Sequence, residues 1–288
     1  MELLKPQAGG RYLDSTVGLG GHAEAILERS APTGLVYGID RDAEALELAW
    51  ARLHRFGGRV ELLHGDFRDL SRLTEGWGPF DGILFDLGVS SFQLADPERG
   101  FSFTKEGPLD MRMDRSGGRT AAELLKGLSE GELIRILQEY GEERWARRIA
   151  KAIVKVGKEE PLISTRQLRE LVERSIPRPA WPRRIHPATR TFQALRIATN
   201  DELRGLDRAL EEAAGLLSPG GRIVVIAFHS LEDRIVKETF RALSFKEPRL
   251  FRLLTKKPLA PSEEELERNP RSRSAKLRAL EKLTTGES

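Results

Sequence analysis

Residues 12–22 read Tyr12-Leu13-Asp14-Ser15-Thr16-Val17-Gly18-Leu19-Gly20-Gly21-His22, a strand-like start that passes through a glycine-rich turn into a helical pattern. Glycines in such a turn let the backbone approach a ligand closely. The free N–H groups at the start of the helix favour a polar or anionic group. By itself, this loop therefore predicts a binding site for an adenosyl cofactor.

Strand-length apolar runs recur around this loop. They lie at 11–14, 35–39, 60–63 and 82–85. Helical patterns separate them, and later in the chain a helix is expected over 202–217 and a strand at 222–228. Strand–helix–strand alternation of this kind predicts an α/β fold with a parallel sheet and helices on both faces.

The middle of the chain departs from this alternation. From about Asp96 to Pro187 there is no convincing strand, whereas helices are expected near 133–140 and 143–156. A proline-rich stretch at 176–182 cannot continue a helix. We therefore expect a doubly wound core formed by residues 1–95 and 191–288, interrupted by an all-α insertion at 96–190.

The composition is that of a soluble globular protein. Of the 288 residues, 39% are hydrophobic and 32% charged, and none is cysteine, which excludes disulfides and thiolate metal sites. The five histidines lack metal-ligand spacing, so no metal is expected. There is no membrane-length apolar run and no signal-peptide pattern at the start, which together predict a cytoplasmic protein without a membrane partner.

Charge is unevenly distributed along the chain. Between Arg112 and Arg190 there are 18 Lys and Arg against 11 Asp and Glu, a local charge of +7, while the whole chain carries +3. A basic middle in a slightly acidic body suggests a polyanionic partner, and a solvated helical surface is the alternative.

The glycines alone do not identify the cofactor. Gly18-x-Gly20-x-x-Ala23 also fits a dinucleotide fingerprint, so an NAD-dependent oxidoreductase remains possible at this point. Asp40 closes the second strand, where a carboxylate would accept hydrogen bonds from ribose hydroxyls in either case.

Three further features favour S-adenosylmethionine. Asp14 precedes the glycines, where it could bind the ammonium of a methionine moiety but would repel a pyrophosphate. Asp66 and Phe67 follow the third strand, where they could bond and stack an adenine. Asp86 ends the fourth strand, at the carboxyl edge where ligands of open α/β sheets bind.

Several longer motifs point to a family. They are Asp86-Leu87-Gly88-Val89-Ser90-Ser91-Phe92-Gln93-Leu94, Arg99-Gly100-Phe101-Ser102-Phe103, Pro108-Leu109-Asp110-Met111-Arg112-Met113-Asp114, His186-Pro187-Ala188-Thr189-Arg190-Thr191-Phe192-Gln193, Phe228-His229-Ser230-Leu231-Glu232-Asp233-Arg234 and Asn269-Pro270-Arg271-Ser272-Arg273. Together they closely resemble the bacterial 16S rRNA (cytosine-N4)-methyltransferases of the RsmH/MraW family, over essentially the whole chain.

The resemblance implies a class I, Rossmann-like methyltransferase sheet with an inserted helical domain. It also implies S-adenosylmethionine as methyl donor and a decoding-centre cytidine of 16S rRNA in the small ribosomal subunit as acceptor. The family's cofactor contacts carry over to Gly20, Gly21, His22, Asp40, Phe67, Asp86 and Gln93. Asp14 and Gly18 join them from the reading of the loop itself. Family members usually carry a His-x-Pro-Val segment upstream of Glu2-Leu3-Leu4. If that segment contributes to the pocket, this chain would bind the cofactor or the RNA less well.

The acceptor chemistry requires hydrogen-bond acceptors for the cytosine amine, whose lone pair is delocalised into the ring. Asp86 is expected to supply one, and Asn200 and His229 could complete the pocket. Phe92, Phe101 and Phe103 are the candidates for the aromatic ring that stacks on the base, and the alternative is that they are core residues of the loop after Asp86.

The RNA is expected to be held through its phosphates by basic side chains of the insertion and of the C-terminal tail. These are Arg144, Arg147, Arg148, Lys151 and Arg190 in the insertion, and Arg268, Arg271, Arg273, Lys276 and Arg278 in the tail. A non-enzymatic RNA-binding or assembly factor remains the second alternative, and the sequence leaves a monomer or dimer open.

Overall fold

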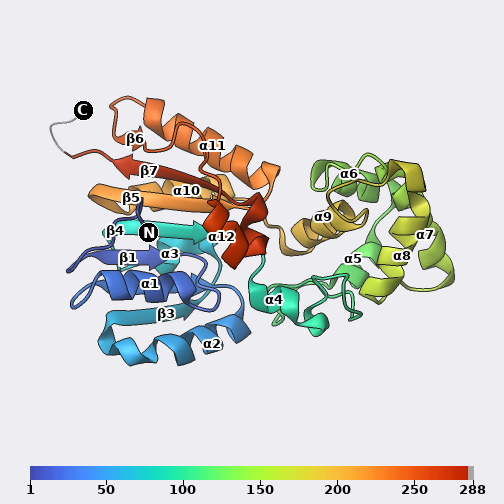
Figure 1. Ribbon diagram of the computed structural model, residues 1–288, viewed down its shortest axis with the longest axis horizontal. Coiled ribbons are helices and arrows are strands. Elements are labelled where there is room, and N and C mark those ends of the chain that lie inside the picture. Colours follow the sequence, from blue (N-terminus) through green and yellow to red (C-terminus); the bar gives the residue numbers. More distant parts are fainter. Residues whose placement is uncertain (285–288) are drawn as a thin grey trace. The chain divides into compact units, whose positions relative to one another are not determined.

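The computed structural model describes residues 1–284 and consists of two compact units (Figure 1). The first comprises Met1–Gly88 and the chain from Leu203 onward, and the second comprises Val89–Glu202. The division thus differs from the expected one at 95/96 and 190/191. Helix α9 (Thr189–Asn200) belongs to the second unit, because Phe192 and Leu195 are buried in the core of that unit.

The first unit is built on a seven-stranded sheet with the strand order β3-β2-β1-β4-β5-β7-β6. Strands β1 to β5 are mutually parallel, and β7 runs antiparallel to both β5 and β6. The strands are β1 Arg11–Asp14, β2 Leu35–Asp40, β3 Val60–His64, β4 Phe80–Asp86, β5 Leu217–Ala227, β6 Phe251–Leu253 and β7 Lys276–Lys282. The parallel part confirms the doubly wound sheet that the alternating pattern predicted.

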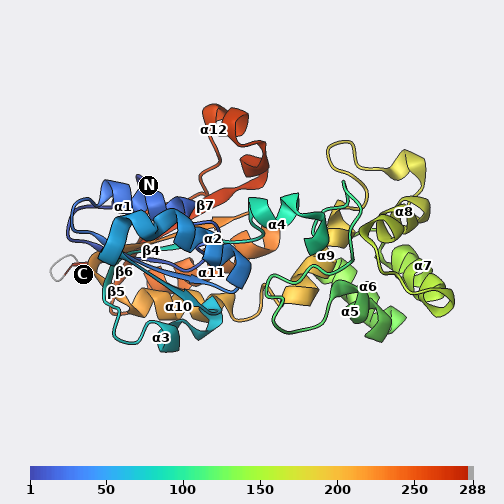
Figure 2. The same ribbon diagram turned by 90° about the horizontal axis from the view of Figure 1, so that it is seen from below.

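Helices cover both faces of this sheet because its central strands are apolar on both sides. Leu13 packs into one core cluster with residues of α10 and α11, and its neighbour Tyr12 packs into another with residues of α1. The same alternation recurs on β4, where Ile83 and Leu84 point to opposite clusters. Figure 2 shows α1 on one side of the sheet and α3 and α10 on the other. The helices of this unit are α1 Gly21–Arg29, α2 Ala43–Leu53, α3 Leu70–Leu73, α10 Leu206–Gly215, α11 Ser230–Phe245 and α12 Glu263–Arg268.

The expected helix over 202–217 was wrong at its start. Helix α9 ends at Asn200, Asp201 takes a left-handed conformation, and α10 begins after Gly205, whose φ is +74°. The chain therefore breaks between the two helices at the point where it passes from one unit to the other. The apolar pattern alone does not reveal this break, since both helices are amphipathic.

Strands β6 and β7 were not predicted. The segment that forms β7 was read as part of a basic tail, yet Arg278 is buried and donates to Asp233 at 2.7 Å, with Lys276 3.2 Å from the same carboxyl group. Glu281 is also buried and accepts from Arg222 and Arg252. Burying these charges as pairs allows a charged sequence to lie inside a sheet. Arg278 therefore has a structural function, and its predicted contact with RNA stays a prediction.

The second unit is helical, with no strand among its residues, all of which are described. Its helices are α4 Ser91–Ala95, α5 Ala121–Gly127, α6 Glu130–Glu139, α7 Ala146–Glu159, α8 Thr165–Ser175 and α9. Four of them begin at a capping box, formed by Ser90 with Gln93, by Thr120 with Glu123, by Ser129 with Glu132 and by Ser164 with Gln167. Each box satisfies backbone N–H groups at the helix start and so fixes where the helix begins.

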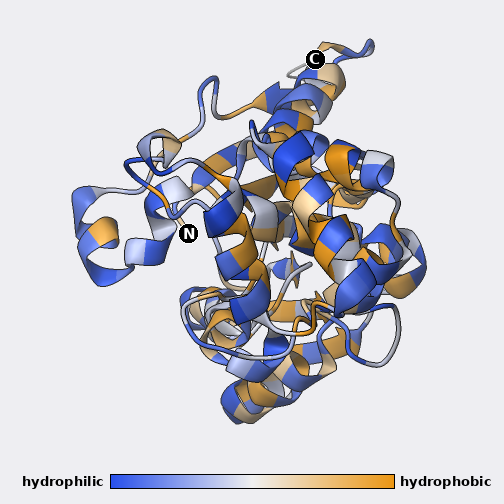
Figure 3. Cartoon of the chain, turned by 90° about the vertical axis from the view of Figure 1, so that its right-hand side faces the viewer, coloured by the Kyte–Doolittle hydropathy of each residue, from blue (hydrophilic) through white to orange (hydrophobic). Residues whose placement is uncertain are grey.

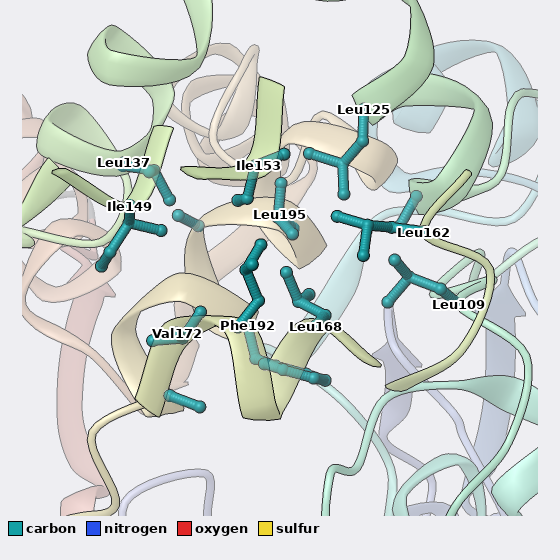
Figure 4. Packing of buried hydrophobic residues seen from close by; sticks show 14 of the residues in the cluster. Leu109, Leu125, Leu137, Ile149, Ile153, Leu162, Leu168, Val172, Phe192 and Leu195 are labelled. Carbon is teal, nitrogen blue, oxygen red and sulfur yellow. The ribbon is translucent and has the colours of Figure 1, made fainter. Parts of the chain in front are cut away.

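The helices of this unit enclose a core of their own. Ile149 and Ile153 of α7 pack with Leu168 of α8 and with Leu195 of α9 (Figure 4). In Figure 3 these helices carry both hydrophobic and hydrophilic residues, as amphipathic helices do. Among residues 1–284 no helix has both the length and the apolar composition needed to cross a bilayer.

Candidate functional site

The glycine loop links the carboxyl end of β1 to the start of α1. Gly18 and Gly20 have φ values of +52° and +79°, a region that favours glycine. Gly20 is the N-cap of α1 and provides no side-chain hydrogen bond to the helix start. A Cβ at Gly20 would lie 3.0 Å from Leu53 Cδ1. The loop thus keeps its backbone close to α2 and leaves the first turn of α1 without a side-chain cap.

Asp14 lies beneath this loop and is fully buried. Its Oδ1 accepts a hydrogen bond from Thr16 N at 3.2 Å, and its Oδ2 has no hydrogen-bond partner among residues 1–284. Burial raises the pKa of Asp14 to about 7, against an ordinary value of 3.8, although the neighbouring His22 opposes this rise. A buried carboxyl oxygen without a donor is suited to receive a cationic group from a ligand.

Asp86 and His22 form a pair next to Asp14. His22 Nε2 lies 3.3 Å from Asp86 Oδ2, and the hydrogen bond to Asp86 raises the pKa of His22. Asp86 Oδ1 is buried and has no hydrogen-bond partner in the described part of the chain. The backbone N–H of Asp86 donates to Thr16 Oγ1 at 2.6 Å, which fixes the end of β4 against the loop.

Asp40 ties the loop to the end of β2. Its two carboxylate oxygens accept from Gly18 N at 2.7 Å and from Asp42 N at 2.9 Å. Burial raises its pKa, and these two backbone hydrogen bonds act in the opposite direction. Asp40 therefore fixes the backbone of the glycine loop, which the sequence did not predict. Its predicted contact with ribose hydroxyls stays a prediction.

The predicted adenine contacts follow β3. Asp66 caps a short 3₁₀ turn, accepts from Arg68 Nη2 at 2.8 Å and lies 3.6 Å from Arg41 Nη1. Burial alone would raise the pKa of Asp66, but the hydrogen bonds from Arg68 and the charge of Arg41 lower it overall. The ring of Phe67 packs edge-on against Phe85, with ring centroids 5.8 Å apart.

Three carboxylates thus meet at the carboxyl edge of three adjacent strands, β2, β1 and β4. Asp14 and Asp86 each keep one buried oxygen without a donor among the described residues. Such a cluster repels a pyrophosphate and attracts a cation. S-adenosylmethionine carries both an ammonium and a sulfonium, so these residues fit it better than they fit NAD.

Two predicted site residues lie in the helical unit. Gln93 is buried and accepts from Ser90 N at 2.9 Å, which caps α4. Asn200 is also buried, where its Nδ2 donates to Met111 O at 2.7 Å and to Arg196 O at 2.9 Å, and its Oδ1 accepts from Met113 N at 2.7 Å. The amide of Asn200 therefore fixes the loop at 111–113, which supports a positioning role for it rather than a direct contact with the base.

His229 is the N-cap of α11 in the sheet unit. Its Nδ1 accepts from Glu232 N at 3.4 Å, and its Nε2 lies 3.1 Å from Glu232 Oε1. Glu232 in turn accepts from His229 N at 3.3 Å, which completes a capping box, and also from Phe228 N at 2.8 Å. These contacts give His229 a structural function, and its predicted contact with the acceptor base stays a prediction.

The predicted RNA contacts fall into two groups. The first group, Arg144, Arg147, Arg148 and Lys151, lies in a stripe of exposed cations on α7 and the turn before it, which also contains Lys155 and Lys158, two residues that were not predicted as contacts. None of these six makes an ion pair with residues 1–284, and we call them the α7 stripe. The second group contains one more residue of the insertion and three of the tail. Arg190 donates to Glu142 O at 2.7 Å, Arg268 pairs with Glu264 at 2.8 Å, and Arg271 and Arg273 are exposed in a 3₁₀ turn.

Sequence reasoning assigned no role to two residues that organise these regions. Thr16 holds the backbone of Asp86, as described above. Arg99 is fully buried and donates to Arg112 O at 3.1 Å and Met113 O at 2.8 Å, so it supports the same loop as Asn200. Within that loop Met111 has a φ of +62°, uncommon for a residue with a side chain. This loop belongs to one of the motifs that carry the family resemblance, but the sequence does not show the hydrogen bonds that Arg99 and Asn200 make to it.

Comparison with known proteins gives a consistent result. A family model described as the MraW methylase family matches residues 1–283. Proteins named ribosomal RNA small subunit methyltransferase H match over nearly their whole length. The chain is 52% identical to that of Citrifermentans bemidjiense, with 98% of this chain and 96% of the relative covered. It is 54% identical to that of Trichlorobacter lovleyi, with 98% and 95% covered.

Proposed function

Because this chain belongs to the MraW methylase family, we propose that it transfers the methyl group of S-adenosylmethionine to the exocyclic N4 of a decoding-centre cytidine in 16S rRNA. The relatives' names support ribosomal RNA of the small subunit as the substrate. The observation that carries the proposal within this chain is the pair of buried, donor-free oxygens on Asp14 and Asp86 beside the glycine loop.

The residues present fit the cofactor. The left-handed glycines let the backbone of the loop lie against a ligand, and Asp14 offers a buried acceptor for its ammonium. Asp40 is placed at the end of β2, where ribose hydroxyls are expected, and Phe67 follows β3, where an adenine is expected. When bound, the cofactor supplies an electrophilic methyl group on its sulfonium.

Asp86 is the residue we assign to the acceptor. Its Oδ1, which has no hydrogen-bond partner among residues 1–284, would accept a hydrogen bond from the cytosine N4–H, which returns electron density to the nitrogen and stabilises the positive charge that develops there. Attack of N4 on the methyl carbon breaks its bond to sulfur and releases S-adenosylhomocysteine, and the N4 proton then passes to a weak base or water. His22 holds Oδ2 and keeps the carboxylate oriented. Because Thr16 fixes the backbone of Asp86, the carboxylate is positioned before the substrate binds, and positioning supplies much of the rate in a transfer of this kind.

The α7 stripe is the part of the helical unit best suited to hold RNA. Lys151, Lys155 and Lys158 follow Arg147 at four, eight and eleven residues, and Arg148 is adjacent to Arg147, so these cations lie on one side of the helix. From Arg147 to Lys158 the helix rises about 16 Å, enough to contact several phosphates. A target base must also leave its stack to reach a methyltransferase site, which favours unpaired RNA.

One experiment tests the enzyme claim. The protein is incubated with methyl-labelled S-adenosylmethionine and either small ribosomal subunits or naked 16S rRNA, and the nucleosides are then analysed. We expect label on the N4 of cytidine. Absence of label from cytosine in both substrates would refute the proposal and favour a non-enzymatic RNA-binding factor.

A second experiment tests the α7 stripe. The double variant Arg147→Glu, Arg148→Glu should bind rRNA more weakly and with a flatter salt dependence, since each lost phosphate contact lowers the salt slope by about one. The matched control is Lys126→Glu, Arg135→Glu, which makes the same charge change at exposed positions of α5 and α6. If both double variants weaken binding equally, the stripe is not a specific RNA contact.

A further inference from the structure

A row of contacts between one arginine and four aromatic side chains lies on the helical unit and takes no part in the site described above. Its outer end is the exposed Arg178, whose guanidinium carbon lies 4.6 Å from the ring centroid of Trp181. His186 follows, with its centroid 6.2 Å from that of Trp181 and 4.7 Å from that of Phe103. Phe103 in turn meets Phe192 edge-on at 5.0 Å. We call these five residues the arginine–aromatic ladder.

The ladder is held rigidly. Trp181 Nε1 donates to Ile176 O at 3.1 Å. His186 Nδ1 accepts from Ala188 N at 3.1 Å, which leaves the proton on Nε2, 3.1 Å from Glu173 Oε1. At the inner end, the backbone of Phe103 accepts from Arg169 Nη1 at 3.2 Å. A ligand that stacks on the ladder would therefore order few additional groups.

The rest of this segment is cationic and free of acidic residues. Residues 174–200 contain six arginines and no Asp or Glu. Arg183 and Arg184, directly after Trp181-Pro182, are exposed, and neither makes an ion pair or side-chain hydrogen bond with residues 1–284. Prolines at 177, 179, 182 and 187 restrict the backbone of this stretch. A row of tilted and edge-on aromatic contacts that ends in an exposed arginine thus lies on a stiff support, beside two arginines without ion pairs among the described residues.

We propose that the arginine–aromatic ladder is a stacking site for an unpaired RNA base, with Arg183 and Arg184 holding the phosphates on either side of it. The base lies on the plane of the Arg178 guanidinium, which Trp181 supports from the other side. That the ligand is RNA rests on the proposed function. Stacking on an aromatic or guanidinium plane requires a splayed base, so the site selects single-stranded RNA over a duplex. An acidic peptide would satisfy the arginines but not the planar stack.

The test measures binding of a fluorescently labelled single-stranded RNA oligonucleotide to the full chain over a series of salt concentrations, with a duplex of the same sequence in parallel. Arg178→Lys keeps the charge and removes the plane. We expect it to weaken single-strand binding by roughly 5- to 150-fold, the range for loss of one stacked base, with little change in salt slope. Arg183→Ala, Arg184→Ala should instead lower the salt slope by about two.

Trp181→Phe and Trp181→Ala extend the series, because Trp181→Phe retains a ring under Arg178 and should lose less affinity than Trp181→Ala. Trp50→Ala is the matched control, since Trp50 is an exposed tryptophan of α2 and should leave binding unchanged. Unaltered binding by Arg178→Lys, or equal losses for single strand and duplex, would overturn the proposal. So would displacement of the RNA by polyglutamate as effectively as by an unlabelled single strand.

Failure of this proposal is distinguishable from failure of the proposed function. If the wild-type chain labels cytidine and the ladder variants bind single-stranded RNA as it does, only the ladder proposal is wrong. If the wild-type chain neither labels cytidine nor binds RNA, both are wrong.

Discussion

Replacement of Asp14 by Asn should make the free energy of unfolding less dependent on pH. Asp14 is fully buried, and its pKa is raised to about 7 from an ordinary value of 3.8. Each unit of difference corresponds to about 1.4 kcal/mol, so the ionised form is about 4 kcal/mol less favourable in the folded than in the unfolded protein. Well below pH 3.8 the carboxyl is protonated in both states and this penalty is absent.

The penalty therefore grows as the pH rises from the unfolded to the folded pKa. Between these values the folded protein binds a proton that the unfolded chain has released, so the free energy of unfolding falls with increasing pH. From pH 5 to pH 8 the two pKa values give a loss of about 2.5 kcal/mol. Asp14→Asn has no such proton. Loss of the Asp14 charge also removes one cause of the raised pKa of His22. This change further reduces the fall in the free energy of unfolding with increasing pH.

The assay is urea unfolding of the ligand-free wild type and of Asp14→Asn at pH 5 and pH 8. For each protein, the free energy of unfolding at pH 8 is subtracted from that at pH 5. Comparing these two differences removes the contribution of the other titrating groups. Glu47→Gln, at an exposed position of α2, serves as the control and should behave as the wild type. Parallel pH dependence of the wild type and Asp14→Asn would refute the reasoning about a buried, protonated Asp14.

Three further substitutions test the site. Asp86→Asn should retain the fold and lower the rate of label transfer at least 100-fold, the usual cost of removing one preorganised transition-state contact, and near-normal transfer would contradict its role. Gly20→Ala should lower the thermal midpoint by several degrees, because its φ is +79° and its Cβ would crowd Leu53, whereas Gly21→Ala has room and should not. Thr16→Val should cost about 1–3 kcal/mol in urea unfolding, because the N–H of Asp86 loses its acceptor, whereas Thr16→Ser should retain most of that stability.

The parallel part of the sheet could be predicted because its determinants are local. The runs at 11–14, 35–39, 60–63 and 82–85 are apolar on both faces and bounded by turns, so they mark β1 to β4 to within two residues at either end. Asp14, Asp40 and Asp86 could be placed at one edge for the same reason, since parallel strands bring their carboxyl ends together.

The C-terminal strands could not be predicted, because their stability depends on distant partners. In β7, Arg278 and Glu281 look like solvent-exposed residues until Asp233, Arg222 and Arg252 are brought beside them by the fold. The sequence therefore did not reveal the structural function of Arg278. The hydrogen bonds of Asn200 could not be predicted either. Its polar side chain suggested a place in the acceptor pocket, whereas in the structure it holds the loop at 111–113.

The α7 stripe and His229 raise the same question, namely whether a polar residue is satisfied within the chain. His229 Nδ1 accepts from Glu232 N within one helical turn, whereas its buried Nε2 makes no hydrogen bond among residues 1–284, although Glu232 Oε1 lies 3.1 Å away. On α7, Ile149 and Ile153 face the core, which places the cations of the stripe on the solvent side, and no described carboxylate pairs with them. Aligned like charges repel one another and lower the stability of the helix. A polyanion that neutralises them removes this cost, and the basic face of the insertion is for that reason better explained by RNA than by solvation alone.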